Sequence, residues 1–135
     1  LGRNDGIDGM QNDLVAIRQR AVRKKSAQLL IGLSCYNEMA RARMALAAGA
    51  DYIAFGSFFP SSTKPSAIRA DVSLIRDAKR EFSLPVVAIG GITLENAPQL
   101  LAAGADSVAV VSSLFNADNI RSQAHLFSSL FPENV

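Results

Sequence analysis

Residues 56–65 carry the densest group of side chains suited to binding a charged ligand. The segment reads Gly-Ser-Phe-Phe-Pro-Ser-Ser-Thr-Lys-Pro, so three hydroxyls and one ammonium occupy positions 61–64. Donors at this spacing can reach several oxygens of a phosphate or pyrophosphate group at once. An ordinary Ser/Thr-rich loop is the alternative interpretation of the same residues.

A second candidate site follows the apolar run 85–89. Pro85 can open a strand, because its missing N–H group costs least at the first position. Gly90 and Gly91 then let the backbone approach a ligand that a side chain would exclude. Thr93 or Asn96 can cap the helix that follows, and the free N–H groups at a helix start favour an anion. A tight turn is the alternative role of the two glycines.

The elements that must position these residues alternate along the chain. Apolar runs predict four strands, at 29–34, 52–56, 85–89 and 107–112. Residues 1–10 are predicted to form a loop, and a helix follows from about residue 12. Further helices are predicted over 37–48, with Asn37 as cap, and from Asp71 through Phe82. The last two are predicted from the cap at 93 or 96 to Ala103, and from Asp118 onward. Alternating strands and helices favour βα units and a parallel sheet.

Two of the predicted elements carry detailed expectations about burial. Val86, Val87 and Ile89 do not alternate with polar residues, so both faces of their strand are expected to be buried. The last helix is expected to bury a narrow apolar stripe formed by Ile120, Ala124, Phe127 and Phe131.

An internal repeat indicates how these units are arranged. The sequence Leu-Ala-Ala-Gly-Ala-Asp occurs at 46–51 and again at 101–106, a spacing of two βα units. Repeated βα units are typical of a (β/α)₈ barrel, which takes about 250 residues and eight strands. Because only four strands are predicted, we expect residues 1–135 to form one partial domain, the C-terminal half of such a TIM barrel. An open parallel sheet is the lesser alternative.

The barrel geometry places the candidate ligand sites together. Barrels of this type bind ligands at the carboxyl ends of their strands, and phosphate often lies between the loops after the last two. Here those loops begin at Gly90 and at Ser112, and residues 61–64 follow another strand end. The sequence therefore predicts a phosphate site on one rim.

Composition excludes several classes of function. Hydrophobic residues make up 49% of the chain and charged residues 19%, with no apolar run long enough to span a membrane. A net charge of +2 is too small to indicate nucleic acid. One cysteine excludes an internal disulfide and favours a reducing compartment, so a cytoplasmic location is expected. The first residues do not resemble a signal peptide and do not begin with methionine, so we expect the chain to be part of a longer one.

Other reactive side chains have simpler interpretations. Cys35 is expected to be a small buried group, since the only histidine, His125, lies on the last predicted helix and off its apolar stripe. Phe58 and Phe59 fit a pocket wall or the core equally well.

Three motifs together resemble the thiamine-phosphate synthase family. They are Phe-Pro-Ser-Ser-Thr-Lys at 59–64, Val-Ala-Ile-Gly-Gly-Ile at 87–92 with Asn96, and Ala-Gly-Ala-Asp-Ser-Val-Ala-Val-Val-Ser at 103–112. The likeness runs from residue 1 to about 116. It implies a (β/α)₈ barrel that uses Mg²⁺ to join hydroxymethylpyrimidine diphosphate to thiazole phosphate, releasing pyrophosphate.

The resemblance also implies roles for individual residues. Ser34, Ser61, Thr63 and Lys64 match the pyrophosphate-binding positions, with serine in place of the usual threonine at 61, and Gly91, Val111 and Ser112 match the thiazole-phosphate positions. Lys64 is the residue expected to act in the coupling. Asp5 matches a Mg²⁺ ligand, with Asp8 and Asp13 as rivals and a loop or helix-cap role as the alternative for all three.

The implied reaction needs no protein nucleophile. Departure of pyrophosphate leaves a pyrimidine methylene cation that the thiazole nitrogen attacks, so a charged clamp suffices. A second hypothesis is a thiazole tautomerase of the same fold, but that family carries a histidine where Tyr36 stands, which counts against it. A third hypothesis is a non-catalytic phosphate-binding regulator or an inactive remnant of the enzyme. We expect the 135 residues alone to be inactive, and their unpaired sheet edges make a homo-oligomer one expected state.

Overall fold

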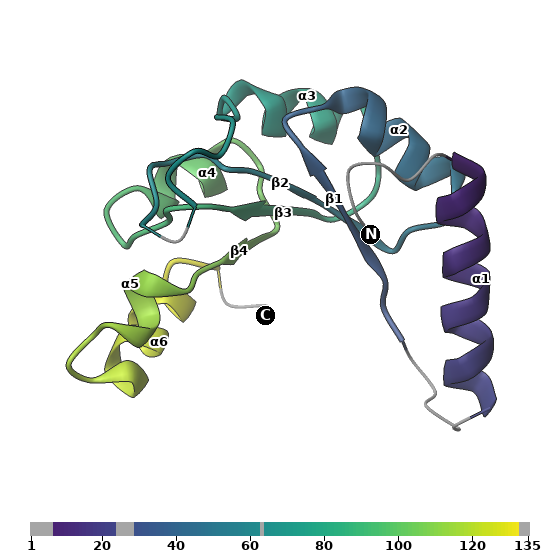
Figure 1. The fold of residues 1–135 in the computed structure, drawn as a ribbon. Coiled ribbons are helices and arrows are strands. Elements are labelled where there is room, and N and C mark those ends of the chain that lie inside the picture. Colours follow the sequence, from purple (N-terminus) through teal and green to yellow (C-terminus); the bar gives the residue numbers. More distant parts are fainter. Residues whose placement is uncertain (1–6, 24–28, 63, 133–135) are drawn as a thin grey trace.

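The computed structural model describes residues 7–23, 29–62 and 64–132. Its elements are α1 (Ile7–Arg23), β1 (Gly32–Tyr36), α2 (Met39–Ala47), β2 (Tyr52–Phe55), α3 (Ser73–Glu81), β3 (Val86–Ile89), α4 (Ala97–Ala102), β4 (Ser107–Ala109), α5 (Ser112–Phe115) and α6 (Ile120–Ser128). Figure 1 shows this alternation of strands and helices along the chain. None of the helices in these ranges is long and apolar enough to cross a membrane.

The four strands form one parallel sheet in the order β1-β2-β3-β4. Sequential strands are neighbours, which is how consecutive βα units add strands around a barrel. Figure 1 shows the sheet curving, with α2 and α3 on its convex side. The prediction of an α/β fold with half the strands of a (β/α)₈ barrel is confirmed.

The prediction that both faces of β3 are buried is wrong. Val86 and Ala88 are fully buried, whereas Val87 is only half-buried and Ile89 is 42% exposed. Side chains alternate between the two faces of a strand, and the described helices cover only one of them. The other face is the one that points into the interior of a (β/α)₈ barrel, where opposite strands fill it.

The core lies between the sheet and its covering helices. Its largest fully buried side chains include Phe55, Ile53 and Leu33 from the strands and Ile75 and Leu100 from the helices. The face of β1 and β2 that carries Leu33, Cys35, Ile53 and Phe55 therefore packs against the helical layer.

The repeated hexapeptide makes the same set of contacts in both of its copies. The Asp51 carboxylate accepts a hydrogen bond of 2.7 Å from the Ile31 amide and one of 2.8 Å from Arg18 on α1. The Asp106 carboxylate accepts one of 2.7 Å from the Val86 amide and one of 2.8 Å from Lys79 on α3.

Backbone hydrogen bonds reinforce each copy. The Asp51 amide donates to the Ile31 carbonyl at 2.8 Å, and the Asp106 amide donates to the Val86 carbonyl at 2.9 Å. Each aspartate thus ties the start of its own strand to the start of the preceding strand. The repeat therefore joins neighbouring strands at their amino ends, which we call the amino edge of the sheet. We call these two sets of contacts the aspartate clasps.

Several predicted helix boundaries change. α1 begins at Ile7, inside the predicted loop at 1–10, and α2 follows Glu38, so Asn37 is not its cap. The Asn37 side chain donates to the Arg69 carbonyl at 3.4 Å instead. Asn119, and not Asp118, caps α6 by accepting a hydrogen bond from Ser122.

Two further expectations concern α3 and α6. The N-cap residue of α3 is Val72, so the prediction of Asp71 as the cap is wrong by one residue; Asp71 instead accepts a hydrogen bond of 2.8 Å from the Ser73 amide just before the helix, and hydrogen bonding from Ser73 lowers the pKa of its carboxyl. In the predicted stripe of α6, Phe127 is buried but Ile120 is 45% exposed. The stripe is therefore only partly covered by the described residues.

Candidate active site

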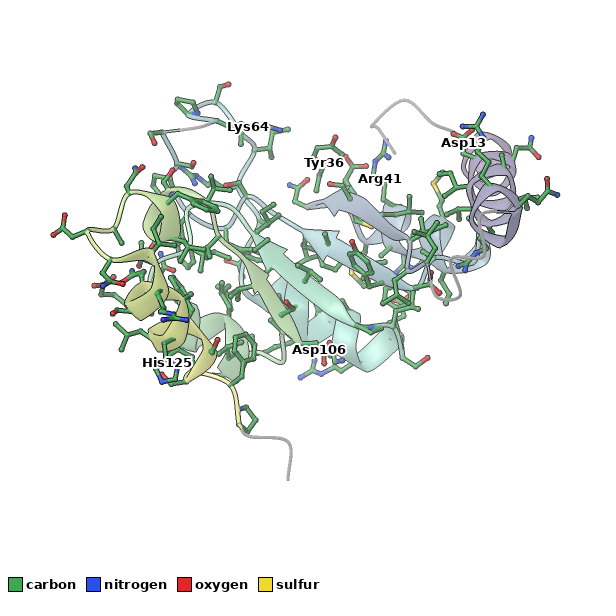
Figure 2. All side chains as sticks on the ribbon, turned by 90° about the horizontal axis from the view of Figure 1, so that it is seen from below. Asp13, Tyr36, Arg41, Lys64, Asp106 and His125 are labelled. Atoms are coloured by element: carbon green, nitrogen blue, oxygen red, sulfur yellow. The ribbon has the colours of Figure 1, made fainter. Side chains whose placement is uncertain are left out.

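A cavity of about 790 Å³ opens at the carboxyl ends of the strands. All four strands contribute to its lining, through their last residues or the segments after them: Ser34 and Tyr36, 56–57, 60–62, 64 and 66–68, 89–93, and 109–113. Figure 2 shows Lys64 and Tyr36 at one edge of the molecule and Asp106, which belongs to an aspartate clasp, at the opposite edge. The cavity and the clasps thus occupy opposite ends of the strands.

The two segments predicted to bind phosphate are joined by their backbones. The Phe58 amide donates to the Ile89 carbonyl at 3.3 Å, and the Phe59 amide donates to the Gly90 carbonyl at 3.1 Å. A Cβ atom on Gly91 would collide with the carbonyl oxygens of Phe59 and Pro60, and the backbone of Gly91 is left-handed, with φ +63°. Gly91 is therefore required by both its conformation and the closeness of the neighbouring loop.

Side chains fix the turn after β3. The Asn96 side chain donates to the Gly91 carbonyl at 3.0 Å and accepts a hydrogen bond of 2.8 Å from the Thr93 amide, while the Thr93 hydroxyl accepts from the Asn96 amide. Asn96 is the N-cap residue of α4, as predicted, but its side chain bonds to the turn and makes no cap hydrogen bond to the helix. α4 has only six residues, so its dipole adds little, and amides, hydroxyls and Lys64 carry the case for an anion.

The structure brings most of the predicted site residues to this one cavity. The six that line it are Ser34, Ser61, Lys64, Gly91, Val111 and Ser112. Thr63 and Asp5 lie outside the described residues. The juxtaposition satisfies the geometric requirement for a shared pocket, while the role of each residue in binding a substrate stays a prediction.

The described part of the cavity contains no carboxylate. Asp13 is exposed on α1, well away from Lys64 in Figure 2, and the side chain of Asp8 lies outside the described set. Within 7–23, 29–62 and 64–132, no three His, Cys, Asp or Glu residues are grouped as a metal site requires. Hydroxyls and one ammonium suit the oxygens of a phosphate better than they suit a bare divalent cation.

Sequence reasoning missed several residues of the cavity wall. Ile89 was expected to be buried, yet it lines the cavity because the inner face of β3 is open. Ile68 lies late in the long loop after β2, where no pattern distinguishes it. In the sequence Tyr36 stands out only as the residue in place of a histidine, although it lines the cavity two positions after Ser34. Strand alternation could have identified it, because residues i and i+2 share a face.

Cys35 and His125 do not form a catalytic pair. Cys35 is 1% exposed, and burial raises the pKa of its thiol to about 11, so little thiolate exists near neutral pH. His125 is exposed on α6 and lies away from Tyr36 and Lys64 in Figure 2. Phe58 is buried and Phe59 packs against the core, so these rings support the loop from within the fold.

Fold and cavity together define an α/β-barrel protein of the kind that places its site at the carboxyl ends of the strands. The family model for thiamine monophosphate synthase matches residues 5–114. The chain therefore belongs to the thiamine monophosphate synthase family.

Individual relatives agree with this assignment. A thiamine-phosphate synthase from Azoarcus sp. is 50% identical over 97% of this chain, and one from Thiobacillus denitrificans is 51% identical over 93%. The chain spans 59% and 60% of their respective lengths. A solved thiamine phosphate pyrophosphorylase from Pyrococcus furiosus is 31% identical, with a TM-score of 0.72 over 96% of this chain and 56% of that chain.

Proposed function

We propose that the protein of this chain is a thiamine-phosphate synthase, a transferase of thiamine biosynthesis that couples hydroxymethylpyrimidine diphosphate to thiazole phosphate. The observation that carries the proposal is the single cavity shared by Lys64 and Gly91. Two phosphorylated substrates must lie side by side for the coupling, and the backbone bonds between residues 58–59 and 89–90 hold the two binding segments together.

The chemistry fits the residues present. The bond between the pyrimidine methylene carbon and the diphosphate oxygen breaks, and its electrons leave with pyrophosphate. The thiazole nitrogen then donates its lone pair to the methylene carbon, which forms the new C–N bond and leaves a thiazolium. Lys64 and the serine hydroxyls would stabilise the charge that develops on the departing pyrophosphate, while the glycine turn and Ser112 would hold the thiazole phosphate.

Magnesium remains part of the proposal through the resemblance to the family. The described lining offers only hydroxyl and backbone oxygens. By the resemblance, we propose Asp5 as the carboxylate ligand, and phosphate oxygens of the substrate would complete the set. When bound, the ion would neutralise phosphate charge. We also propose a cytoplasmic location, in line with the buried thiol of Cys35, and small phosphorylated substrates, in line with the hydroxyls and the ammonium in the cavity lining.

The test is the formation of thiamine phosphate by the complete protein. Lys64→Ala is expected to lower kcat/KM by about 100-fold or more, because it removes the only ammonium in the described lining. Lys64→Arg should keep part of the activity, since the charge remains. Lys79→Ala is the matched control, because it removes an ammonium at the opposite edge of the sheet.

Two outcomes would contradict the proposal. If the complete protein forms no thiamine phosphate yet binds thiazole phosphate, a non-catalytic phosphate-binding role replaces the enzyme. If Lys64→Ala and Lys79→Ala retain equal activity, the charged clamp is wrong. The 135 residues alone are expected to give no product.

A further inference from the structure

Tyr36 has an unusual backbone conformation at the edge of the candidate active site. Its φ is +55°, and it is the one non-glycine residue with positive φ in the described part of the chain. The register of the β1–β2 pairing shifts between Ser34 and Tyr36, and the Gly56 amide donates to the Tyr36 carbonyl at 3.0 Å. Conformations of this kind persist where the surrounding structure holds them, and they gather at functional sites.

Arg41 holds the ring of Tyr36 from the helical layer. The guanidinium carbon of Arg41 lies 5.6 Å from the centre of the Tyr36 ring, and Arg41 itself is only 8% exposed. Its Nε also lies 3.5 Å from the Glu38 carboxylate. A cation over an aromatic ring is more strongly bound when it is shielded from water, so this contact restrains the ring.

The position of Tyr36 suits a wall of the cavity. Tyr36 lines the cavity whereas Arg41 does not, so Arg41 supports the ring from outside. In the view of Figure 2, Tyr36 lies between Arg41 and Lys64. The lining thus combines a restrained aromatic ring and apolar side chains such as Ile89 with the hydroxyls and ammonium that suit phosphate.

We infer that Tyr36 is a positioning residue, against whose ring the planar heterocycle of a phosphorylated substrate packs. The inference rests on the proposed function, which supplies two substrates of this class, a pyrimidine and a thiazole. Offset stacking between planar rings fixes orientation as well as affinity, and a ring already restrained by Arg41 loses little freedom on binding.

The test measures ligand binding to the complete protein by calorimetry, so it does not depend on turnover. The ligands are hydroxymethylpyrimidine diphosphate, thiazole phosphate and, as a probe without a ring, inorganic pyrophosphate. Tyr36→Asn removes the ring while keeping a residue that tolerates positive φ. It is expected to weaken at least one heterocyclic ligand about tenfold and pyrophosphate by less than about twofold.

Two further variants sharpen the test. Tyr36→Phe, the conservative variant, keeps the ring and should recover most of the affinity lost in Tyr36→Asn. Arg41→Met removes the cation that holds the ring and is expected to weaken the same heterocyclic ligand about threefold. Arg43→Met is its matched control on α2, because Arg43 pairs with Glu81 on α3, away from the cavity. Thermal unfolding curves identify any variant that fails to fold. If Arg41→Met does not fold, the comparison of Tyr36→Asn with Tyr36→Phe decides whether the ring binds the heterocycle.

Each remaining outcome overturns the inference. Equal weakening of pyrophosphate and the heterocycles in Tyr36→Asn indicates a general structural role. Equal losses in Tyr36→Phe and Tyr36→Asn identify the hydroxyl, and not the ring, as the contact. If the unsubstituted protein binds the heterocyclic ligands and Tyr36→Asn binds them equally well, only this inference fails. If the unsubstituted protein binds neither, the proposed function fails with it.

Discussion

The amino ends and the carboxyl ends of the four strands differ in the residues they carry and in what those residues do. At the amino edge, Asp51 and Asp106 make nearly the same hydrogen bonds, to a strand amide at 2.7 Å and to a basic side chain at 2.8 Å. At the carboxyl edge, the segments after the strands share no such pattern: one carries hydroxyls and a lysine, another two glycines, and another a tyrosine with positive φ.

The difference shows why a repeat is visible at only one edge. The β1–β2 pair and the β3–β4 pair are joined at the start of their strands in the same way, so the same hexapeptide serves in both places. A ligand touches each loop with a different atom, so the loops of a binding site differ from one another. In barrels of this type the amino edge serves stability and the carboxyl edge serves function.

The largest effect is expected from placing a side chain at Gly91. Gly91→Ala should lower the free energy of unfolding by about 3 kcal/mol or more, because positive φ and a collision with the 59–60 backbone act together. Activity should fall with it. Gly49→Ala is the control at the other edge: Gly49 has φ +85° but no atom within 4 Å of an added Cβ, so only about 1–2 kcal/mol should be lost. Equal losses in denaturant unfolding would contradict the role of the collision.

A second prediction concerns Cys35, in the core between the two edges. Burial raises the pKa of its thiol from 9.0 to about 11, so the unfolded chain loses the proton first as pH rises. As far as Cys35 is concerned, the free energy of unfolding should be constant below pH 9, fall by up to about 2.7 kcal/mol between pH 9 and 11, and then level off. The measurement is denaturant unfolding across this range, compared with Cys35→Ala to remove other titrations. Parallel curves for the two proteins would sink the prediction.

The smallest effect is expected at an aspartate clasp. Asp106→Ala should cost about 1–2 kcal/mol of unfolding free energy, since the Val86 amide and Lys79 lose their partner at a partly exposed site. Asp51→Ala should behave alike, and Lys79→Ala should cost less than about 1 kcal/mol. Activity of the folded protein should be unchanged in all three. A selective loss of kcat in Asp106→Ala would break the separation between the two edges.

The sequence predicted the elements better than their surroundings. The runs at 52–56 and 85–89 match β2 and β3 to within one residue, because β-branched and aromatic residues ended by glycine leave little choice. The exposure of Ile89 could not be predicted, because it depends on which strands face β3 across the barrel interior. The run at 107–112 was too long by three residues, since the chain turns at Val111 into α5.

The candidate site was predictable where motifs lie at strand ends and less so elsewhere. Ser61, Lys64 and Gly91 were found from hydroxyl density and glycine pairing, and the parallel sheet brings them to one cavity. The conformation of Tyr36 was not predictable, because no local rule places an aromatic residue at positive φ. Its support comes from Arg41 in the next element, which is a tertiary contact.

The hydrogen bonds from Phe58 and Phe59 to the end of β3 have a mechanical consequence. They join the loop after β2 to the turn after β3, so the two segments are expected to move together. A substitution that displaces the first loop should disturb ligands of the second even without touching them. Loop exchange between relatives should accordingly succeed only when both loops are transferred together.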